Sequence, residues 1–154
     1  MTHTINLIQG EKMKRSILLL LTVFSLLCQA QNEESNIKTE NIAKAIESSN
    51  QWLKSVDSSN YELSWENSSE LFKKSITKEN WVSALESVRT PLGKITSREI
   101  KTKEYRTTLP GAPDGEYVVI VYITEFENKE NSYETITSMK DKDGKCRVSG
   151  YYIK

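Results

Sequence analysis

The spacing of apolar residues changes once along this chain, from three or four residues in residues 40–89 to two residues in residues 94–153. The first spacing places apolar side chains on one stripe of a helix, and the second places them on one face of a strand. Helices grouped before strands are typical of α+β domains, and short connections make neighbouring strands antiparallel. The sequence therefore predicts an α+β fold with three N-terminal helices packed on a curved four-stranded antiparallel meander sheet.

The three helices are expected over residues 40–56, 61–74 and 78–89. Thr77 precedes the third helix, where a threonine side chain accepts a hydrogen bond from the first turn. A proline and a glycine, Pro91 and Gly93, then end the helical pattern.

Four strands are expected, over residues 94–109, 116–127, 132–139 and 145–153. Apolar residues of the first strand change parity, which predicts a bulge or bend in residues 98–101. The core of the second strand reads Tyr-Val-Val-Ile-Val-Tyr-Ile and is apolar on both sides. Strands of this kind are usually buried on both faces, so we expect both faces of the sheet to be covered there.

Residues 1–30 have the pattern of a secretory signal. The stretch Met13-Lys14-Arg15 is positive, residues 16–27 are apolar but too few to span a bilayer, and Ala30 ends a small-residue cleavage motif. We expect Met13 to be the start of translation, cleavage to follow Ala30, and the protein to be exported to a periplasm or secreted. Residues 31–38 are expected to form a flexible lead-in, and residues 39–154 a single α+β domain.

A second interpretation of this segment concerns Cys28, which would be the lipidated cysteine of a bacterial lipoprotein. Gly or Ala usually precedes such a cysteine, whereas Leu27 stands there in this chain. Soluble export is therefore the favoured interpretation.

Charge and residue types exclude several classes of function. The chain carries 21 basic and 21 acidic side chains, unlike the basic composition of nucleic-acid-binding domains. Its one histidine, His3, lies in the expected signal segment, and Cys146 is the single cysteine beyond that segment. This excludes Ser-His-Asp and Cys-His catalysis and the usual zinc sites. We expect no metal and no cofactor, so any catalysis is limited to carboxylates, Lys, Tyr or Arg.

An ordered set of motifs runs through residues 42–153: Trp52-Leu53, Tyr61, Ser64-Trp65, Trp81, Val88-Arg89, Pro91-Leu92-Gly93, Arg98, residues 110–117, Glu134-Thr135, and residues 144–151. In order and spacing this set resembles the bacterial domain-of-unknown-function family 4019. Cys146 departs from the family pattern, which more often has Trp at that position. The resemblance implies a nuclear-transport-factor-2-like or cystatin-like cone, a shape that often leaves a pocket between sheet and helices.

Five residues are candidates for a ligand site: Tyr61, Trp65, Arg89, Arg98 and Glu134. Arginine suits bidentate contacts with carboxylates, so the two arginines are expected either to hold an anionic ligand or to pair with Glu134 inside the cone. The alternative for Arg89 is a favourable charge at a helix C-terminus. The alternative for the aromatic candidates is packing in the core.

The function favoured by these observations is a non-enzymatic binding or interaction domain of the cell envelope, for a small ligand or a partner protein. One alternative is a pocket enzyme, an isomerase or hydrolase, in which burial makes Glu134 a general base and a second carboxylate such as Glu116 assists. The other is a dimerisation module that pairs through the open face of the sheet. The interface of that homodimer is expected to include Tyr117, Tyr122, Tyr151 and Tyr152. Neither nucleic acid nor a transmembrane span is expected.

Overall fold

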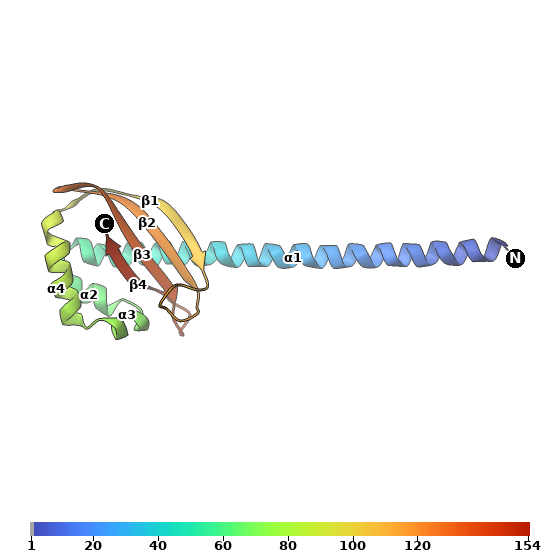
Figure 1. Ribbon diagram of the computed structural model, residues 1–154, viewed down its shortest axis with the longest axis horizontal. Helices are drawn as coiled ribbons and strands as arrows, with labels where there is room; N and C mark the ends of the chain where they lie inside the picture. Colours follow the sequence, from blue (N-terminus) through green and yellow to red (C-terminus); the bar gives the residue numbers. More distant parts are fainter. Residues whose placement is uncertain (1) are drawn as a thin grey trace. The chain divides into compact units, whose positions relative to one another are not determined.

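The computed structural model describes residues 2–154, with side chains for residue 29 and residues 31–154. Its elements, in chain order, are helices α1 (Thr2–Asp57), α2 (Tyr61–Glu66), α3 (Glu70–Ser75) and α4 (Lys78–Val88), the 3₁₀ turn η1 (Thr90–Leu92), and strands β1 (Ile95–Arg106), β2 (Tyr117–Phe126), β3 (Lys129–Lys140) and β4 (Cys146–Ile153) (Figure 1). The predicted α+β class is confirmed.

The chain divides into two compact units, Met1–Thr39 and Glu40–Lys154. Except for residue 29, the expected signal segment lies outside the residues whose side chains are described, so export and the role of Cys28 stay predictions. Residues 31–38 are helical with exposed side chains, and their flexibility also stays a prediction. Within the described residues, no helix combines the length and apolar character needed to cross a bilayer.

The second predicted helix is two helices in the structure, with the buried residues Ser68 and Ser69 between them. The side chain of Ser69 accepts a hydrogen bond from the Phe72 N–H at 3.2 Å and so caps α3. The Ser69 N–H donates to the carbonyl oxygen of Val148 in β4 at 2.8 Å. The prediction of one helix over residues 61–74 is wrong, because the break supplies a hydrogen-bond partner to the edge strand.

The four strands form one sheet in the order β1-β2-β3-β4, and each strand is antiparallel to its neighbour. This confirms the predicted meander. The register between β1 and β2 shifts between Ile100 and Thr102, which makes Lys101 the extra residue of a bulge within the predicted interval. A second shift lies between Ile95 and Ser97.

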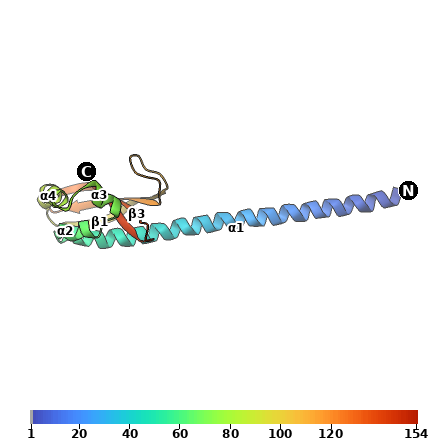
Figure 2. The same ribbon diagram turned by 90° about the horizontal axis from the view of Figure 1, so that it is seen from below.

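One face of the sheet, called the inner face here, packs against the helices of the second unit. Val118, Ile120 and Tyr122 of β2 point to it and share a buried cluster with Trp52 and Leu53 of α1. Figures 1 and 2 show this C-terminal part of α1 running along one side of the sheet.

Aromatic rings fill the centre of the layer between helices and sheet. The ring centroid of Trp81 lies 4.9 Å from that of Phe72 and 5.9 Å from that of Trp52. The Trp52 ring in turn lies 5.2 Å from Tyr151 on β4. These separations are in the favourable range for aromatic pairs. Side chains therefore occupy the space in which the resemblance implied a pocket.

The opposite face of the sheet, called the outer face here, is not packed against the helical core. Val119, Val121 and Ile123 of β2 point to it, are only partly buried, and lie outside the core cluster. The expectation that both faces of the second strand are covered is therefore wrong for the described part of the chain.

The strand parity also corrects the expected homodimer interface. Tyr122 and Tyr151 point to the inner face. Tyr117 is buried under the preceding loop, where its hydroxyl donates to the Pro113 carbonyl oxygen at 2.6 Å. Of the four tyrosines, Tyr152 is the one on the open surface, with 63% of it exposed.

Candidate functional site

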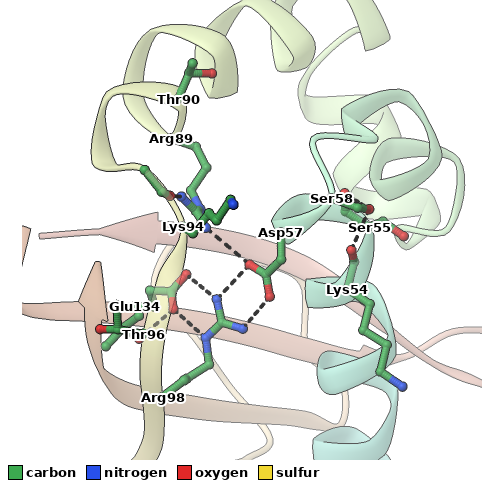
Figure 3. A network of polar contacts seen from close by, with 12 residues as sticks. Lys54, Ser55, Asp57, Ser58, Arg89, Thr90, Lys94, Thr96, Arg98 and Glu134 are labelled. Atoms are coloured by element: carbon green, nitrogen blue, oxygen red, sulfur yellow. Dashed lines mark hydrogen bonds and ion pairs between the residues drawn. The ribbon is translucent and has the colours of Figure 1, made fainter. Parts of the chain in front are cut away.

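A network of arginine and carboxylate side chains ties the end of α1 to the sheet (Figure 3). Arg98 of β1 donates from Nε to Glu134 Oε2 at 2.6 Å and from Nη2 to Glu134 Oε1 at 3.2 Å. The same guanidinium donates from Nη1 to Asp57 Oδ2 at 2.8 Å and from Nη2 to Asp57 Oδ1 at 3.0 Å. Arg98 thus makes a bidentate contact with each of two carboxylates, one from β3 and one from the last residue of α1.

Glu134 is fully buried, with 0% of it exposed. It accepts two further hydrogen bonds, from Thr124 Oγ1 to Oε2 at 2.6 Å and from the Tyr151 hydroxyl to Oε1. Each carboxylate oxygen therefore accepts two hydrogen bonds, and the acceptor sites of the group are filled. The filled acceptor sites stabilise Glu134 as one half of a buried ion pair. They also leave no carboxylate oxygen free to accept a proton from a substrate.

Arg89, the C-cap residue that follows α4, is the second arginine of the network and is only 4% exposed. Its Nη1 donates to the Gly93 carbonyl oxygen at 2.6 Å, and its Nη2 lies 3.5 Å from Asp57 Oδ1. The guanidinium lies over the ring of Phe126, 4.5 Å from the ring centroid, in a cation–π contact. Two arginines and two carboxylates thus balance their charges between α1, α4 and the sheet.

A hollow of about 290 Å³ lies beside the network, where α1 and α4 end. The Tyr61 hydroxyl lies 3.4 Å from Thr90 Oγ1 at this place. Tyr61 is therefore brought close to the charged candidates. The residues that line the hollow include Asp57, Tyr61, Arg89, Thr90, Lys94 and Glu127.

Trp65 is not part of this arrangement. Its indole Nε1 donates to the Ile76 carbonyl oxygen at 2.9 Å, and the ammonium groups of Lys73 and Lys78 lie 5.8 and 5.6 Å from its ring centroid. The structure places Trp65 in the packing of α2 against α3 and α4.

Glu116, the expected second carboxylate, also lies elsewhere. It accepts hydrogen bonds from Lys140 at 2.9 Å and from Asn41 at 2.5 Å. Glu134 lies opposite Tyr122 in the register of β2 and β3, and Tyr122 follows Glu116 by six residues in the chain. Since a strand rises about 3.4 Å per residue, the two carboxylates are about 20 Å apart. That separation is too large for paired acid–base chemistry on one small substrate.

The turn before β2 borders a larger cleft of about 820 Å³. Lysines and carboxylates both line the cleft, so its charge favours neither an anion nor a cation. Its lining includes Lys73, Lys74, Asp114, Lys140, Asp143 and Arg147.

Residues 48–151 match the family model described as Protein of unknown function (DUF4019). The match covers more than half of the chain. The chain belongs to this family. No curated protein and no solved structure is found to be similar to it.

The charged network lies wholly inside the DUF4019 region, whereas the unit Met1–Thr39 lies outside it. Sequence reasoning missed three residues of the network, Asp57, Thr124 and Tyr151. A signal for Asp57 was present, because a carboxylate at the C-terminal end of a helix opposes the helix dipole and calls for a compensating cation. No comparable local signal marked Tyr151.

Two further observations concern metal-ligand side chains and the thiol of Cys146. Among the described residues, no three His, Cys, Asp or Glu side chains cluster as metal ligands would. Burial raises the pKa of the Cys146 thiol, which keeps it in its less reactive protonated form.

The pKa is shifted for Arg98 and Tyr151 of the network and for the nearby Tyr122. Burial acts to lower the pKa of Arg98, but hydrogen bonds and charges from Asp57 and Glu134 outweigh burial and raise that pKa. Burial, followed by the charge and the hydrogen bond of Glu134, raises the pKa of Tyr151 well above its usual value. Burial raises the pKa of Tyr122 to about 12, with the charge of Arg98 opposing the rise and that of Glu134 adding to it.

These shifts predict that the DUF4019 protein loses stability above about pH 10, the usual tyrosine pKa. Above that pH an unfolded tyrosine loses its proton while folded Tyr122 and Tyr151 keep theirs. The free energy of unfolding is then expected to fall by about 1.4 kcal/mol per pH unit for each tyrosine, until the folded pKa is reached. Below about pH 10 both states hold these protons, and the two tyrosines add no pH dependence. Urea denaturation over a series of alkaline pH values measures the slope.

Tyr151→Phe is expected to reduce this slope. It is also expected to lower the free energy of unfolding at every pH, because the hydrogen bond to Glu134 is missing. Tyr152→Phe is the matched control, since Tyr152 is exposed on the outer face, and its profile is expected to follow the wild type. An unchanged slope in Tyr151→Phe would contradict the assignment.

Proposed function

We propose that this DUF4019 protein is an exported, non-enzymatic interaction domain that binds another protein molecule on the outer face of its sheet. The observation that carries the proposal is the row Val119, Val121 and Ile123, which is apolar and only partly buried. The helices cover one face and leave this apolar row open on the other. A contiguous exposed apolar patch is typical of a protein–protein interaction site.

The composition of the outer face supports this role. Around the row on β2 lie uncharged side chains of β3 and β4, among them Tyr133 and Tyr152, which are large and exposed. Charged residues stand mainly at the rim, on β1, at Glu125 near the end of β2 and after β4. One cation reaches inward, since the ammonium of Lys101 lies 4.5 Å from the ring centroid of Tyr133. An uncharged, aromatic-rich centre with a polar rim is the usual anatomy of a protein interface. The uncharged residues of the centre are Val119, Val121, Ile123, Tyr133, Thr135, Thr137 and Tyr152.

A catalytic role inside the cone is less well supported. Aromatic rings fill the centre between helices and sheet, and the acceptor sites of Glu134 are occupied. The hollow beside Tyr61 and Arg89 favours a second candidate function, the binding of a small polar ligand. That hollow is small and its lining charges balance, so we place it second.

Two further parts of the proposal concern shape and location. The antiparallel meander with helices against one face supports the nuclear-transport-factor-2-like or cystatin-like cone. The pattern of residues 1–30 supports export, either as a soluble protein or, less favoured, as a lipoprotein through Cys28.

A photo-cross-linking amino acid in place of Val121 tests the docking surface in the protein's own host. We expect illumination to give one discrete covalent product, because the side chain at this position lies in the middle of the apolar row. The same amino acid in place of Val88 is the matched control, since Val88 is an apolar residue of α4 that is 50% exposed. The measurement is the mass of the cross-linked product.

The charge-bearing change Thr135→Lys, beside Val121 on the outer face, is expected to abolish the product. The proposal fails if position 121 gives no discrete product, or if positions 121 and 88 give the same products.

A further inference from the structure

The strand register sorts the outer face into rows that run across the sheet. One row reads Glu99, Ile123, Tyr133 and Lys154, from β1 to the residue after β4. Tyr133 and Lys154 exchange backbone hydrogen bonds of 3.0 and 2.9 Å, so they lie directly opposite each other. The row is therefore acidic at one end and basic at the other. Its middle is apolar and aromatic, with the ammonium of Lys101 over the ring of Tyr133. No ion pair with another described residue occupies Glu99 or Lys154.

We propose that the partner is a second copy of this chain, packed outer face to outer face about a two-fold axis that runs parallel to the strands. This inference rests on the docking surface proposed above. Such an axis places β1 of one copy over β4 of the other. Each row of one copy then lies over the same row of the other copy, in the reverse direction. Glu99 of each copy then faces Lys154 of the other, and Ile123 faces Tyr133.

The next two rows are compatible with the same axis. One reads Thr102, Val121, Thr135 and Tyr152, so Val121 faces Thr135 across the interface. The other begins with Glu104 and ends with Gly150, so the carboxylate meets no second acid. Opposite charges face each other at the rim, as electrostatic complementarity requires. The residues that meet at the centre are uncharged except for Lys101, whose ammonium lies over Tyr133 of its own copy.

The end row, from Arg106 to Arg147, would bring two arginines together. Each arginine already pairs with acids of its own chain: Arg106 with Glu104, and Arg147 with Asp141 and Asp143. This row therefore adds little repulsion.

The other aligned arrangement has its two-fold axis across the strands. In the aligned class of sheet packing the strands of the two sheets stay within about 30° of each other, and these two axes are the ones that give an aligned pair. With the axis across the strands and the Thr102 row at the centre, Glu104 of one copy faces Glu99 of the other. Like charges directly opposite each other are destabilising. The axis parallel to the strands is therefore favoured.

The size of the face sets the expected strength of the dimer. Four strands about 4.8 Å apart and seven residues long, at about 3.4 Å per residue, span about 450 Å² of flat surface per copy. This is at the low end of specific interfaces. We therefore expect a dimer that forms at high protein concentration and dissociates on dilution.

Charge reversal tests the pairing on the full chain purified from its host, with the dissociation constant measured by analytical ultracentrifugation. Glu99→Lys and Lys154→Glu are each expected to weaken the dimer by about tenfold or more, since each sets like charges against each other. The double variant restores opposite charges and is expected to recover the wild-type constant. Glu86→Lys is the matched control, because Glu86 is an exposed acid of α4 away from the sheet, and its dimer is expected to be unchanged.

A wild-type protein that stays monomeric at high concentration overturns the homodimer. The docking surface itself still stands in that case if the product cross-linked at position 121 has the mass of one chain plus a different protein. The Glu99–Lys154 pairing is overturned if both single variants keep the wild-type dissociation constant, or if the double variant does not recover it.

Discussion

Replacing Arg98 by methionine is expected to lower the free energy of unfolding by about 3–5 kcal/mol, the usual loss when one partner of a buried ion pair is removed. Methionine keeps an apolar stem of similar length but leaves Glu134 without a cation in a site that is 0% exposed. Asp57 is affected less, because it is 29% exposed and keeps its contact with Arg89. Urea denaturation of the full chain, with comparison of midpoints and slopes, measures the change.

Arg106→Met is the matched control for this prediction. Arg106 pairs with Glu104, and 57% and 53% of the two side chains are exposed. An exposed ion pair contributes about 1 kcal/mol or less, so a small loss is expected. A loss of that size for Arg98→Met would contradict the importance of the buried pair.

Adding Glu134→Leu to Arg98→Met is expected to recover a large part of the lost stability, because no charge is then left buried in the sheet. Tyr151 loses its acceptor in the double variant, so full recovery is not expected. If the double variant is no more stable than Arg98→Met, the loss comes from the missing Arg98 contacts and not from the buried charge of Glu134.

The elements whose signals are local could be predicted from the sequence. Thr77 was expected to cap a helix, and its side chain accepts a hydrogen bond from the Asn80 N–H at 3.3 Å. The change of apolar spacing placed the helices before the strands, and the change of parity in the first strand placed the bulge at Lys101. Each of these features depends on residues close together in the chain, so a sequence pattern is enough to find it.

The features that depend on distant residues could not be predicted in the same way. The break between α2 and α3 is explained by the hydrogen bond from Ser69 to Val148, and these residues are far apart in sequence. Asp57 lies just after the first predicted helix, and its role follows only once the sheet places Arg98 beside it. The candidate site was therefore found in part, through Arg89, Arg98 and Glu134, while Asp57, Thr124 and Tyr151 were missed.

The two faces of the sheet show a third limit of prediction from the sequence. A strand that is apolar on both sides indicates that both faces need cover, but it does not say whether the cover comes from the same chain. For Tyr122, Tyr151 and Tyr152, the strand pairing decides which tyrosines point to the helices and which to the open side. The mistaken set of interface tyrosines came from choosing residues by type before the parity was known.

Replacing Trp52 by alanine is expected to lower the free energy of unfolding by about 3–5 kcal/mol, as is usual for the loss of a large buried aromatic side chain. Trp52 is 3% exposed and packs against the rings of Trp81 and Tyr151. Its indole Nε1 also donates to the Ser64 carbonyl oxygen at 2.7 Å and to Ser68 Oγ at 3.0 Å. The change therefore removes packing and leaves buried acceptors with one donor fewer. Urea denaturation measures the loss.

Trp65→Ala provides the comparison, since Trp65 is only partly buried and two lysines lie over its ring. A clearly smaller loss is expected there. The result at Trp52 also bears on function, because the layer between helices and sheet is where a pocket enzyme would hold its substrate. A large loss supports a packed core and leaves the outer face as the surface for binding. A loss below about 1 kcal/mol, much less than a packed aromatic contributes, would mean that the layer is loosely filled, and the pocket hypothesis would then regain its basis.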